Sequence, residues 1–436
     1  MKSVESNFEG LAWSERLLGL EPRWTLEPDT GPIKQTIQAL RPSRAVEVTF
    51  LAQGALNKTY DIKIDDEMLI MRVSLPVDPY HKAMSEVSTM DWISRTTKIP
   101  VPKVISYQTS RDNQIGLEWI LMTKLPGKPL GDVWKSLSFL AKEKLVRELA
   151  VQSAFLFRNQ TRGIGNIYTP SSDLALNDEI FEKEGSYEAP PYIGRIVSMH
   201  FFWGSHVLQD INRGSFRSSN DWIISRLSLN ENDCHLTLDK LPASDRDSED
   251  EDEAEDATRT LQIIEDLKSL IPLIFPPDCD PSEPSMIFHD DLSRHNILVS
   301  DSGDVTGILD WECVSALPLW RACDYPAFLE GTPRRLEPDI TRYCAEGNGE
   351  PSDLYWEHLE QYENTLLRDI FIDEMRILEP RWVDIFDKNQ YRRDFETAVQ
   401  NCDNPFIARY IRAWIDDINA KVENLRSLRN RIYEDC

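Results

Sequence analysis

Cysteine pairs, long apolar runs and targeting signals are all missing from this sequence. Its seven cysteines are spread irregularly, with no CxxC and no tight Cys/His grouping. This usage fits neither a disulfide framework nor a zinc finger, so we expect a reducing compartment. No run of about 18 apolar residues occurs, so no bilayer span is expected. The first twenty residues have neither a signal-peptide apolar core nor a transit-peptide composition, and we therefore expect a cytoplasmic protein.

Positive charge is also scarce, because 48 Lys and Arg residues face 74 Asp and Glu residues, for a net charge of −26. Such an acidic chain argues against nucleic acid and anionic membranes as partners. It favours solubility, or a neutral or cationic small-molecule substrate. The motifs GxSxG, Walker A, HExxH and GxGxxG are absent, which removes the basis for a serine hydrolase, a P-loop or a Rossmann interpretation. Nothing in the sequence indicates the oligomeric state.

The patterning of what is present indicates an α+β chain. Residues 1–48 predict a helical N-terminal extension interrupted by prolines. Residues 49–125 then read as short apolar strands around turns, with one helix whose apolar positions recur every three or four residues. We expect this region to form a small antiparallel sheet with one helix, closed by a Pro/Gly-containing connection.

Residues 126–436 are predicted to be mainly helical, including a helix over residues 193–211. An acidic insertion lies around residues 243–257. Between Asp245 and Asp256, nine of twelve residues are acidic, which favours a solvated, disordered segment.

The most informative stretch is "MIFHDDLSRHNILVSDSGDVTGILDWE", residues 286–312. Apolar residues before His289 predict a strand that ends at Asp291, and two further apolar runs around "DSGD" predict a hairpin. This hairpin brings Asn296 near Asp310, so we expect both to converge with Asp291. Two carboxylates and an amide oxygen suit Mg²⁺ with a phosphate ester better than zinc.

The combination "HDDLSRHN" and "LDWE" resembles the aminoglycoside phosphotransferase branch of the protein-kinase-like phosphotransferases, in particular a fungal subgroup. The resemblance extends from about Thr49 to Gly331. It implies a two-lobed kinase-like fold, with residues 49–125 as the nucleotide-binding N-lobe and residues 126–436 as a helical C-lobe. It further implies that ATP and Mg²⁺ are the cofactors, and that a hydroxyl of a small molecule is the acceptor.

Carried over position by position, the resemblance makes Asp291 the catalytic aspartate that orients the attacking hydroxyl. Asn296 and Asp310 match the metal ligands, and His289 matches the histidine that braces the catalytic loop. We also expect Asp324, after "PLWRAC", to support the catalytic segment structurally.

The N-lobe match is looser and involves separate strands. Gly54 and Asn57, in "LAQGALNKTY", lie where the family has a phosphate-covering hairpin, although a single glycine is also an ordinary turn residue. The stretch containing Met122, Lys124 and Leu125 matches the hinge, whose backbone is expected to bind adenine.

The strand basic residue that grips the α- and β-phosphates corresponds to Arg72, where the family has lysine. Arginine keeps its charge and can fork onto phosphate oxygens. Lys63, one strand earlier, is the alternative. Glu86 in the following helix is the expected partner of Arg72, with an ordinary exposed glutamate as the simpler interpretation.

Further departures from the family pattern leave alternatives open. Asp290 replaces a small residue before the catalytic aspartate, and Trp311 and Glu312 replace the Phe-Gly of protein kinases. Together with Arg72, these leave a catalytically weak or inactive pseudokinase, acting as a nucleotide-binding or scaffold protein, as a second interpretation. A two-metal hydrolase is a third. It would use His289, Asp290, Asp291 and His295 as ligands, and it leaves Asn296, Asp310 and their hairpin unexplained.

Overall fold

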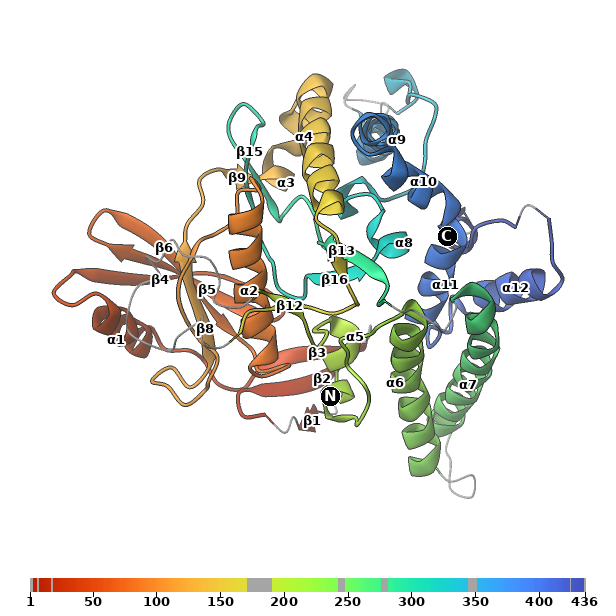
Figure 1. The fold of residues 1–436 in the computed structure, drawn as a ribbon, viewed down its shortest axis with the longest axis horizontal. Helices are drawn as coiled ribbons and strands as arrows, with labels where there is room; N and C mark the ends of the chain where they lie inside the picture. The colour runs from red at the N-terminus through yellow and green to blue at the C-terminus, as the bar shows by residue number, and fades with distance from the viewer. Residues whose placement is uncertain are drawn as a thin grey trace.

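The computed structural model describes residues 3–5, 8–16, 19–170, 190–241, 248–275, 281–343, 351–423 and 425–434. Antiparallel β-structure gathers at one side of the molecule and helices make up most of the other (Figure 1). This arrangement confirms the predicted α+β class. In the described residues, no helix is long and apolar enough to span a bilayer.

The largest sheet has five antiparallel strands in the order β4-β5-β6-β8-β7. Its elements, with the helices on its two faces, are β4 (Val46–Gln53), β5 (Asn57–Ile64), β6 (Glu67–Ser74), β7 (Val104–Gln108), β8 (Glu118–Thr123), α1 (Thr30–Leu40) and α2 (His81–Thr96). Because side chains alternate along a strand, Leu69, Met71 and Val73 of β6 pack in one core with α1. Arg72 and Ser74 instead point to the opposite face, toward α2.

The N-terminal segment contains a sheet that the sequence patterning did not predict. Strands β1 (Ser3–Glu5), β2 (Leu11–Arg16) and β3 (Gly19–Trp24) pair antiparallel, and only α1 is helical within the described part of residues 1–48. The predicted helical extension is therefore wrong. Leu11 and Trp13 are buried on alternate positions, which is the spacing of a strand, and they pack against Val197 and Phe202 of the helical body.

The connection between the two sides of the molecule is itself a strand. Strand β9 (Lys128–Pro129) pairs with β14 (Ile297–Val299), which in turn pairs with β15 (Val305–Ile308). Gly127 precedes this strand with φ +114°, and a Cβ there would come within 2.8 Å of the Val299 carbonyl oxygen. Only glycine accommodates both the backbone conformation and this close approach.

Substituting this glycine should therefore destabilise the fold. We expect Gly127→Ala to lower the free energy of unfolding by about 2–4 kcal/mol, because left-handed strain and steric overlap act together. Urea unfolding, followed by circular dichroism, measures this loss of stability. Gly331→Ala is the matched control, since Gly331 has φ +134° but a Cβ added there would meet no other atom within 4 Å. Equal losses in both variants would show that the close approach to Val299 costs nothing.

The remaining elements form the helical body and two small sheets. In chain order they are α3 (Leu130–Val133), η1 (Trp134–Ser136), α4 (Phe139–Arg158), β10 (Thr161–Arg162), β11 (Ile167–Tyr168), β12 (Tyr192–Ile193), α5 (Met199–Phe202), η2 (His206–Leu208), α6 (Ser219–Lys240), α7 (Ser248–Ile274), β13 (Pro284–Phe288), β16 (Ser315–Pro318), α8 (Leu319–Ala322), η3 (Ala327–Leu329), η4 (Ile340–Arg342), α9 (Asp353–Leu378), α10 (Pro380–Lys388), α11 (Gln390–Gln400), α12 (Ala408–Asn419) and α13 (Leu428–Glu434). The helix predicted over residues 193–211 is replaced by β12 and two short helical turns.

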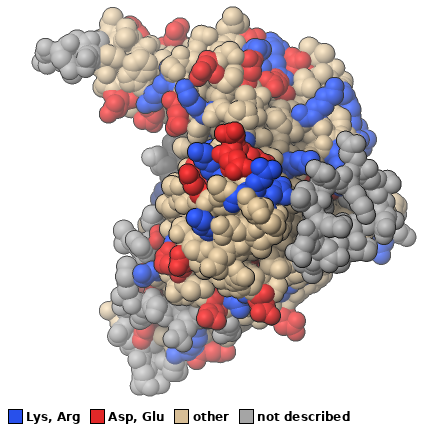
Figure 2. Space-filling model, turned by 90° about the vertical axis from the view of Figure 1, so that its left-hand side faces the viewer, with Lys and Arg blue, Asp and Glu red and all other residues tan. Residues whose placement is uncertain are grey.

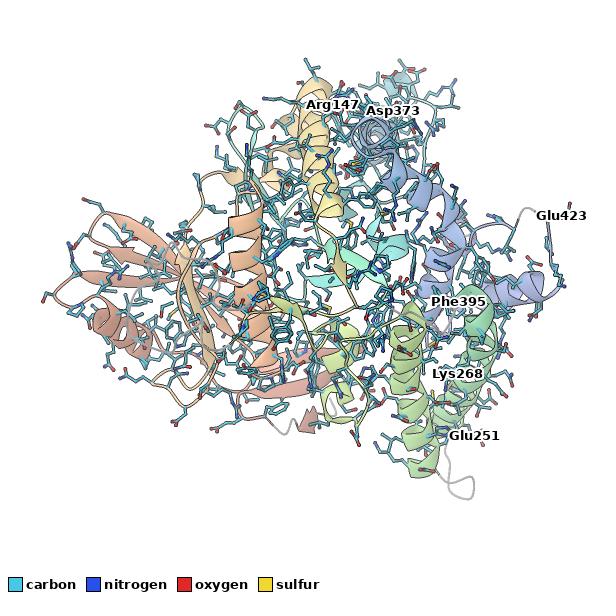
Figure 3. The ribbon with its side chains drawn as sticks, viewed as in Figure 1. Arg147, Glu251, Lys268, Asp373, Phe395 and Glu423 are labelled. Atoms are coloured by element: carbon cyan, nitrogen blue, oxygen red, sulfur yellow. The ribbon has the colours of Figure 1, made fainter. Side chains whose placement is uncertain are left out.

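The acidic segment is helical where the structure describes it. Helix α7 begins at Ser248, so the prediction of disorder is wrong from that residue onward, and residues 242–247 lie outside the described residues. Ala254 and Ala257 are buried, whereas Glu251, labelled in Figure 3, is exposed near the start of the helix. Acids on the solvent side and alanines on the packed side make an amphipathic helix. Lys268 of α7 also pairs with Glu231 of α6 at 2.6 Å.

Candidate active site

The catalytic stretch forms the hairpin that the sequence predicts. Ile297 of β14 pairs with Ile308 of β15, and the Leu309 backbone N–H donates to the Asn296 carbonyl at 2.8 Å. This register sets Asn296 at the start of one strand beside Asp310 at the end of the other. Asp310 has φ +61°, a conformation that is uncommon for a residue other than glycine and that is found disproportionately at functional sites.

Asp291 and Asn296 are joined directly. The Asn296 amide donates to Asp291 Oδ2 at 3.0 Å and to the Asp291 backbone carbonyl at 2.9 Å. Both bonds use the amide nitrogen, which leaves the Asn296 carbonyl oxygen as a hard ligand. The carboxylate of Asp291 is thereby oriented, and within the described residues its Oδ1 accepts no hydrogen bond.

A charged network links the five-stranded sheet to Asp310. Arg72 Nη1 donates to Asp310 Oδ1 at 3.0 Å, and Arg72 Nη2 forms an ion pair with Glu86 of α2. The Glu86 side chain is almost fully buried, so the exposed-glutamate interpretation is wrong. Burial raises the pKa of Asp310, and the neighbouring carboxylate of Glu312 raises it further, against the opposing charge of Arg72.

Lys82 is a site residue that the sequence analysis missed. It lies in the first turn of α2, is 1% exposed, and its Nζ contacts Glu312 Oε2 at 2.5 Å and Asn57 Oδ1 at 3.0 Å. Asn57 also donates to Glu312 Oε2 at 2.7 Å and accepts from Ser74. We name Lys82, Asn57, Ser74 and Glu312 the lysine cluster. One signal was available, because Lys82 precedes Glu86 by four residues and so shares its helix face.

The predicted role of Asn57 must be considered in the light of this cluster. Its side chain is 7% exposed and is bound by Glu312, Ser74 and Lys82. Asn57 thus links β6 and α2 to Glu312, two residues after Asp310. Gly54 is exposed in the turn between β4 and β5, where its N–H donates to the Asn57 carbonyl at 2.9 Å.

The hinge and support residues are distributed as follows. Met122 is buried within β8, and Leu125 packs against Gly307 of β15. Lys124 pairs with Asp61 of β5 at 2.7 Å, so its side chain is held on the sheet. His289 Nε2 contacts the Leu309 carbonyl at 3.0 Å, which ties the catalytic loop to the residue before Asp310.

Asp324 is buried, but its hydrogen bonds are to residues outside the catalytic loop. Its carboxylate accepts from the Tyr325 backbone N–H at 2.9 Å and lies 3.3 Å from Arg429 of α13. Among the described residues, therefore, Asp324 anchors the C-terminal helix and has no hydrogen bond to the catalytic loop. The ring of His289 packs edge-on against Trp311 at 5.2 Å between centroids.

A two-metal hydrolase site does not form in the described part of the chain. No group of three or more His, Cys, Asp or Glu side chains there is arranged to hold a metal ion. His295 lies instead against Gly131 of α3, away from His289. The pair of Asn296 and Asp310 needs no third protein ligand for Mg²⁺, because that ion usually keeps waters and phosphate oxygens.

A cavity of about 420 Å³ borders the catalytic segment. Its lining includes Asp290, which directly precedes Asp291, and side chains from α6, α8, α11 and α13. Figure 3 labels Phe395 on α11, next to the cavity residue Glu396. A volume of this size is typical of small-molecule sites. Figure 2 shows a different face, where described acidic and basic side chains are interspersed without a continuous basic area.

Fold and site together define a kinase-like phosphotransferase architecture, and comparison with known proteins gives the family. Residues 47–324 match the model of the phosphotransferase enzyme family, APH. The match covers more than half of the chain, and the chain therefore belongs to this family.

Several fungal proteins are related in sequence. A subtelomeric hrmA-associated cluster protein of Aspergillus fumigatus is 24% identical over 314 residues, which cover 65% of this chain and 60% of that protein. The clavilactone A biosynthesis cluster protein Y of Ampulloclitocybe clavipes is 29% identical over 311 residues, covering 67% and 66%. The mitochondrial altered inheritance of mitochondria protein 9 of Eremothecium gossypii is 22% identical over 347 residues, covering 72% and 55%. The chain thus spans about 60% of the length of the Aspergillus relative.

Solved structures of low sequence identity are also similar. Aminoglycoside phosphotransferase APH(4)-Ia matches at a TM-score of 0.42 and 13% identity, covering 91% of this chain and 100% of that one. A thermostable mutant of the same enzyme, in a ternary complex with ADP and hygromycin B, matches at 0.42 and 14%, covering 90% and 99%.

Proposed function

We propose that this protein is an ATP- and Mg²⁺-dependent phosphotransferase that transfers the γ-phosphate to a hydroxyl of a small molecule. The observation that carries the proposal is the hydrogen bond of Asn296 to Asp291, together with the strand pairing that sets Asn296 beside Leu309 and Asp310. Asp310 in turn binds Arg72, the partner of Glu86. A scaffold protein does not need all of these groups together. Family membership supports the same reaction class.

Asp291 would position and deprotonate the acceptor. Its Oδ2 is held by Asn296, and its Oδ1 is available to a substrate hydroxyl. In the transfer, the acceptor oxygen forms a bond to the γ-phosphorus, the bond to the leaving ADP oxygen breaks, and the hydroxyl proton passes to Asp291. Most of the rate enhancement would come from alignment and charge stabilisation.

The candidate metal ligands fit Mg²⁺ in their donor types. Asn296 offers its carbonyl oxygen and Asp310 its carboxylate, and when bound, the ion would neutralise phosphate charge. Arg72 donates to Asp310 through Nη1 and pairs with Glu86 through Nη2, and donors not used in these contacts would bind phosphate oxygens. Glu312, two residues after Asp310, adds a buried carboxylate, but Lys82 and Asn57 already occupy it.

Nucleotide binding gives the direct test of the proposal. Mg²⁺ and ATP together should raise the melting temperature, since a ligand present at 100 times its Kd stabilises by about 2.7 kcal/mol. This gain should vanish in Asp310→Ala and persist in Asp301→Ala, which removes an exposed acid from the turn of the same hairpin. Differential scanning fluorimetry measures both variants. No shift in the wild type at millimolar nucleotide would sink the proposal and favour a scaffold.

A further inference from the structure

The cavity beside Asp290 contains a guanidinium group without a hydrogen-bond partner. Arg321, on α8, lines this cavity, and its side chain is 14% exposed. Among the described residues it donates no hydrogen bond, and its Nη1 is a buried atom without a partner. The nearest carboxylate oxygens lie at 3.5 Å, on Glu396, and at 3.9 Å, on Asp324.

Both of those carboxylates are already bound by other arginines. Glu396 accepts from Arg226 at 2.7 Å, and Asp324 lies 3.3 Å from Arg429. Three guanidinium groups thus share two carboxylates within ion-pair distance. Burial would raise the pKa of Glu396, but Arg226 and Arg321 outweigh it and hold the pKa at about 2, so this carboxylate is fully charged at neutral pH. Of these three arginines, Arg321 is the one without a hydrogen bond to either carboxylate.

Two further acids face the cavity, but within the described residues neither accepts a hydrogen bond from Arg321. Asp290 and Glu330 line it, and within the described chain neither carboxylate has an ion-pair partner within 4.0 Å. They are available to hydroxyl or ammonium groups of a ligand, whereas Arg321 Nη1 still lacks an acceptor.

A guanidinium nitrogen without a hydrogen bond in a recessed site is costly, because that donor has left water without a replacement. A planar anion with two oxygens supplies that replacement, since arginine binds carboxylates in a fork geometry. The guanidinium carbon of Arg321 lies over the ring of Phe288, 5.1 Å from its centroid.

We propose that the phosphate acceptor carries an anionic group, in the simplest case a carboxylate, which binds Arg321 in this cavity while its hydroxyl faces Asp291. The inference rests on the proposed function and names the substrate class of that same site. It replaces the cationic acceptor expected from the net charge, because the unfilled Nη1 of Arg321 at this cavity, and not the total charge of the chain, indicates which group is held.

The test compares hydroxy acids with matched uncharged and cationic alcohols. Glycerate, serine and quinate would be offered with Mg-ATP, beside glyceramide, serinamide, ethanolamine and choline, at constant ionic strength. We expect turnover with at least one acid and a KM for it that rises about 10- to 100-fold in Arg321→Gln, in keeping with the loss of a charge-assisted hydrogen bond. Arg321→Lys should recover part of this loss, and the KM for ATP should not change.

Arg342→Gln is the matched control, because that side chain is 82% exposed. A clear preference for ethanolamine or choline, or equal kinetics in the Arg321 and Arg342 variants, would overturn the inference.

A binding measurement decides the case in which none of these acceptors turns over. Sulfate should then raise the melting temperature of the wild type more than that of Arg321→Gln, and an equal rise in both proteins would overturn the inference. Loss of the Asp310-dependent Mg-ATP shift would instead remove the proposed function itself, so the two failures are distinguishable.

Discussion

Asp291→Asn should lower turnover by about 10²- to 10⁴-fold while leaving the stabilisation by Mg-ATP intact. Asparagine keeps the size of the side chain and can still meet the Asn296 amide through its oxygen, but it cannot take a proton from the acceptor hydroxyl. Coupled measurement of ADP release, with an acceptor found by screening or with water in the slow intrinsic hydrolysis, gives the rate. Thermal-shift titration gives nucleotide binding in the same samples.

The adjacent aspartate provides the internal comparison for this experiment. Asn296 binds the carboxylate of Asp291, whereas Asp290 lines the cavity. Asp290→Asn should therefore act mainly on the KM for the acceptor and lower kcat by less than tenfold. Wild-type turnover in Asp291→Asn would show that the catalytic role is assigned to the wrong residue.

Lys82→Met should lower the free energy of unfolding by about 3–5 kcal/mol, because it removes one partner of a buried ion pair. In the variant, Glu312 would keep only the Asn57 amide as a close donor, and its side chain is only 13% exposed. Urea unfolding at pH 7 measures the change. Lys128→Met is the matched control, since its pair with Asp301 is exposed and should contribute at most about 1 kcal/mol.

The pH dependence of the stability difference between the wild type and Lys82→Met gives a second readout. Burial would raise the pKa of Glu312, but the charges of Lys82 and Arg72 outweigh it and lower the pKa to about 2, from an ordinary 4.5. A depressed carboxylate pKa stabilises the fold above the unfolded value and loses that contribution as pH falls through the folded value. The difference in free energy of unfolding between the wild type and Lys82→Met should therefore decrease as the pH falls from 5 toward 2. A constant gap would mean that the lost methylene packing, and not the ion pair, causes the destabilisation.

The parts of the site that the sequence predicted are those with short-range determinants. The hairpin is specified by two apolar runs around "DSGD", so the neighbourhood of Asn296 and Asp310 follows from strand pairing alone. The contact of Arg72 with Glu86 spans a strand and a helix, and it was anticipated from the resemblance to the phosphotransferase family. Both the hairpin and the contact are present in the structure.

The parts that the sequence did not predict depend on long-range packing. A lysine at the start of a helix is ordinarily solvated, and only the approach of Glu312, 230 positions further along the chain, makes Lys82 a buried residue. The same holds for the cavity, whose arginines come from α6, α8 and α13. The strands before α1 were missed because prolines and a short apolar alternation were interpreted as an interrupted helix.

The pairing of β9 with β14 bears on how this chain can be divided or recombined. The crossover segment Lys128–Pro129 is a strand edge-bonded to the ribbon that carries Asn296 and Asp310. A chimera with its fusion junction inside this segment would cut through a sheet, and a donor module grafted upstream would also have to supply the counterparts of Asn57 and Lys82 for Glu312. A junction after residue 129 leaves β9 intact, but the pairing of β9 with β14 and the contacts of Glu312 then form between the two parents.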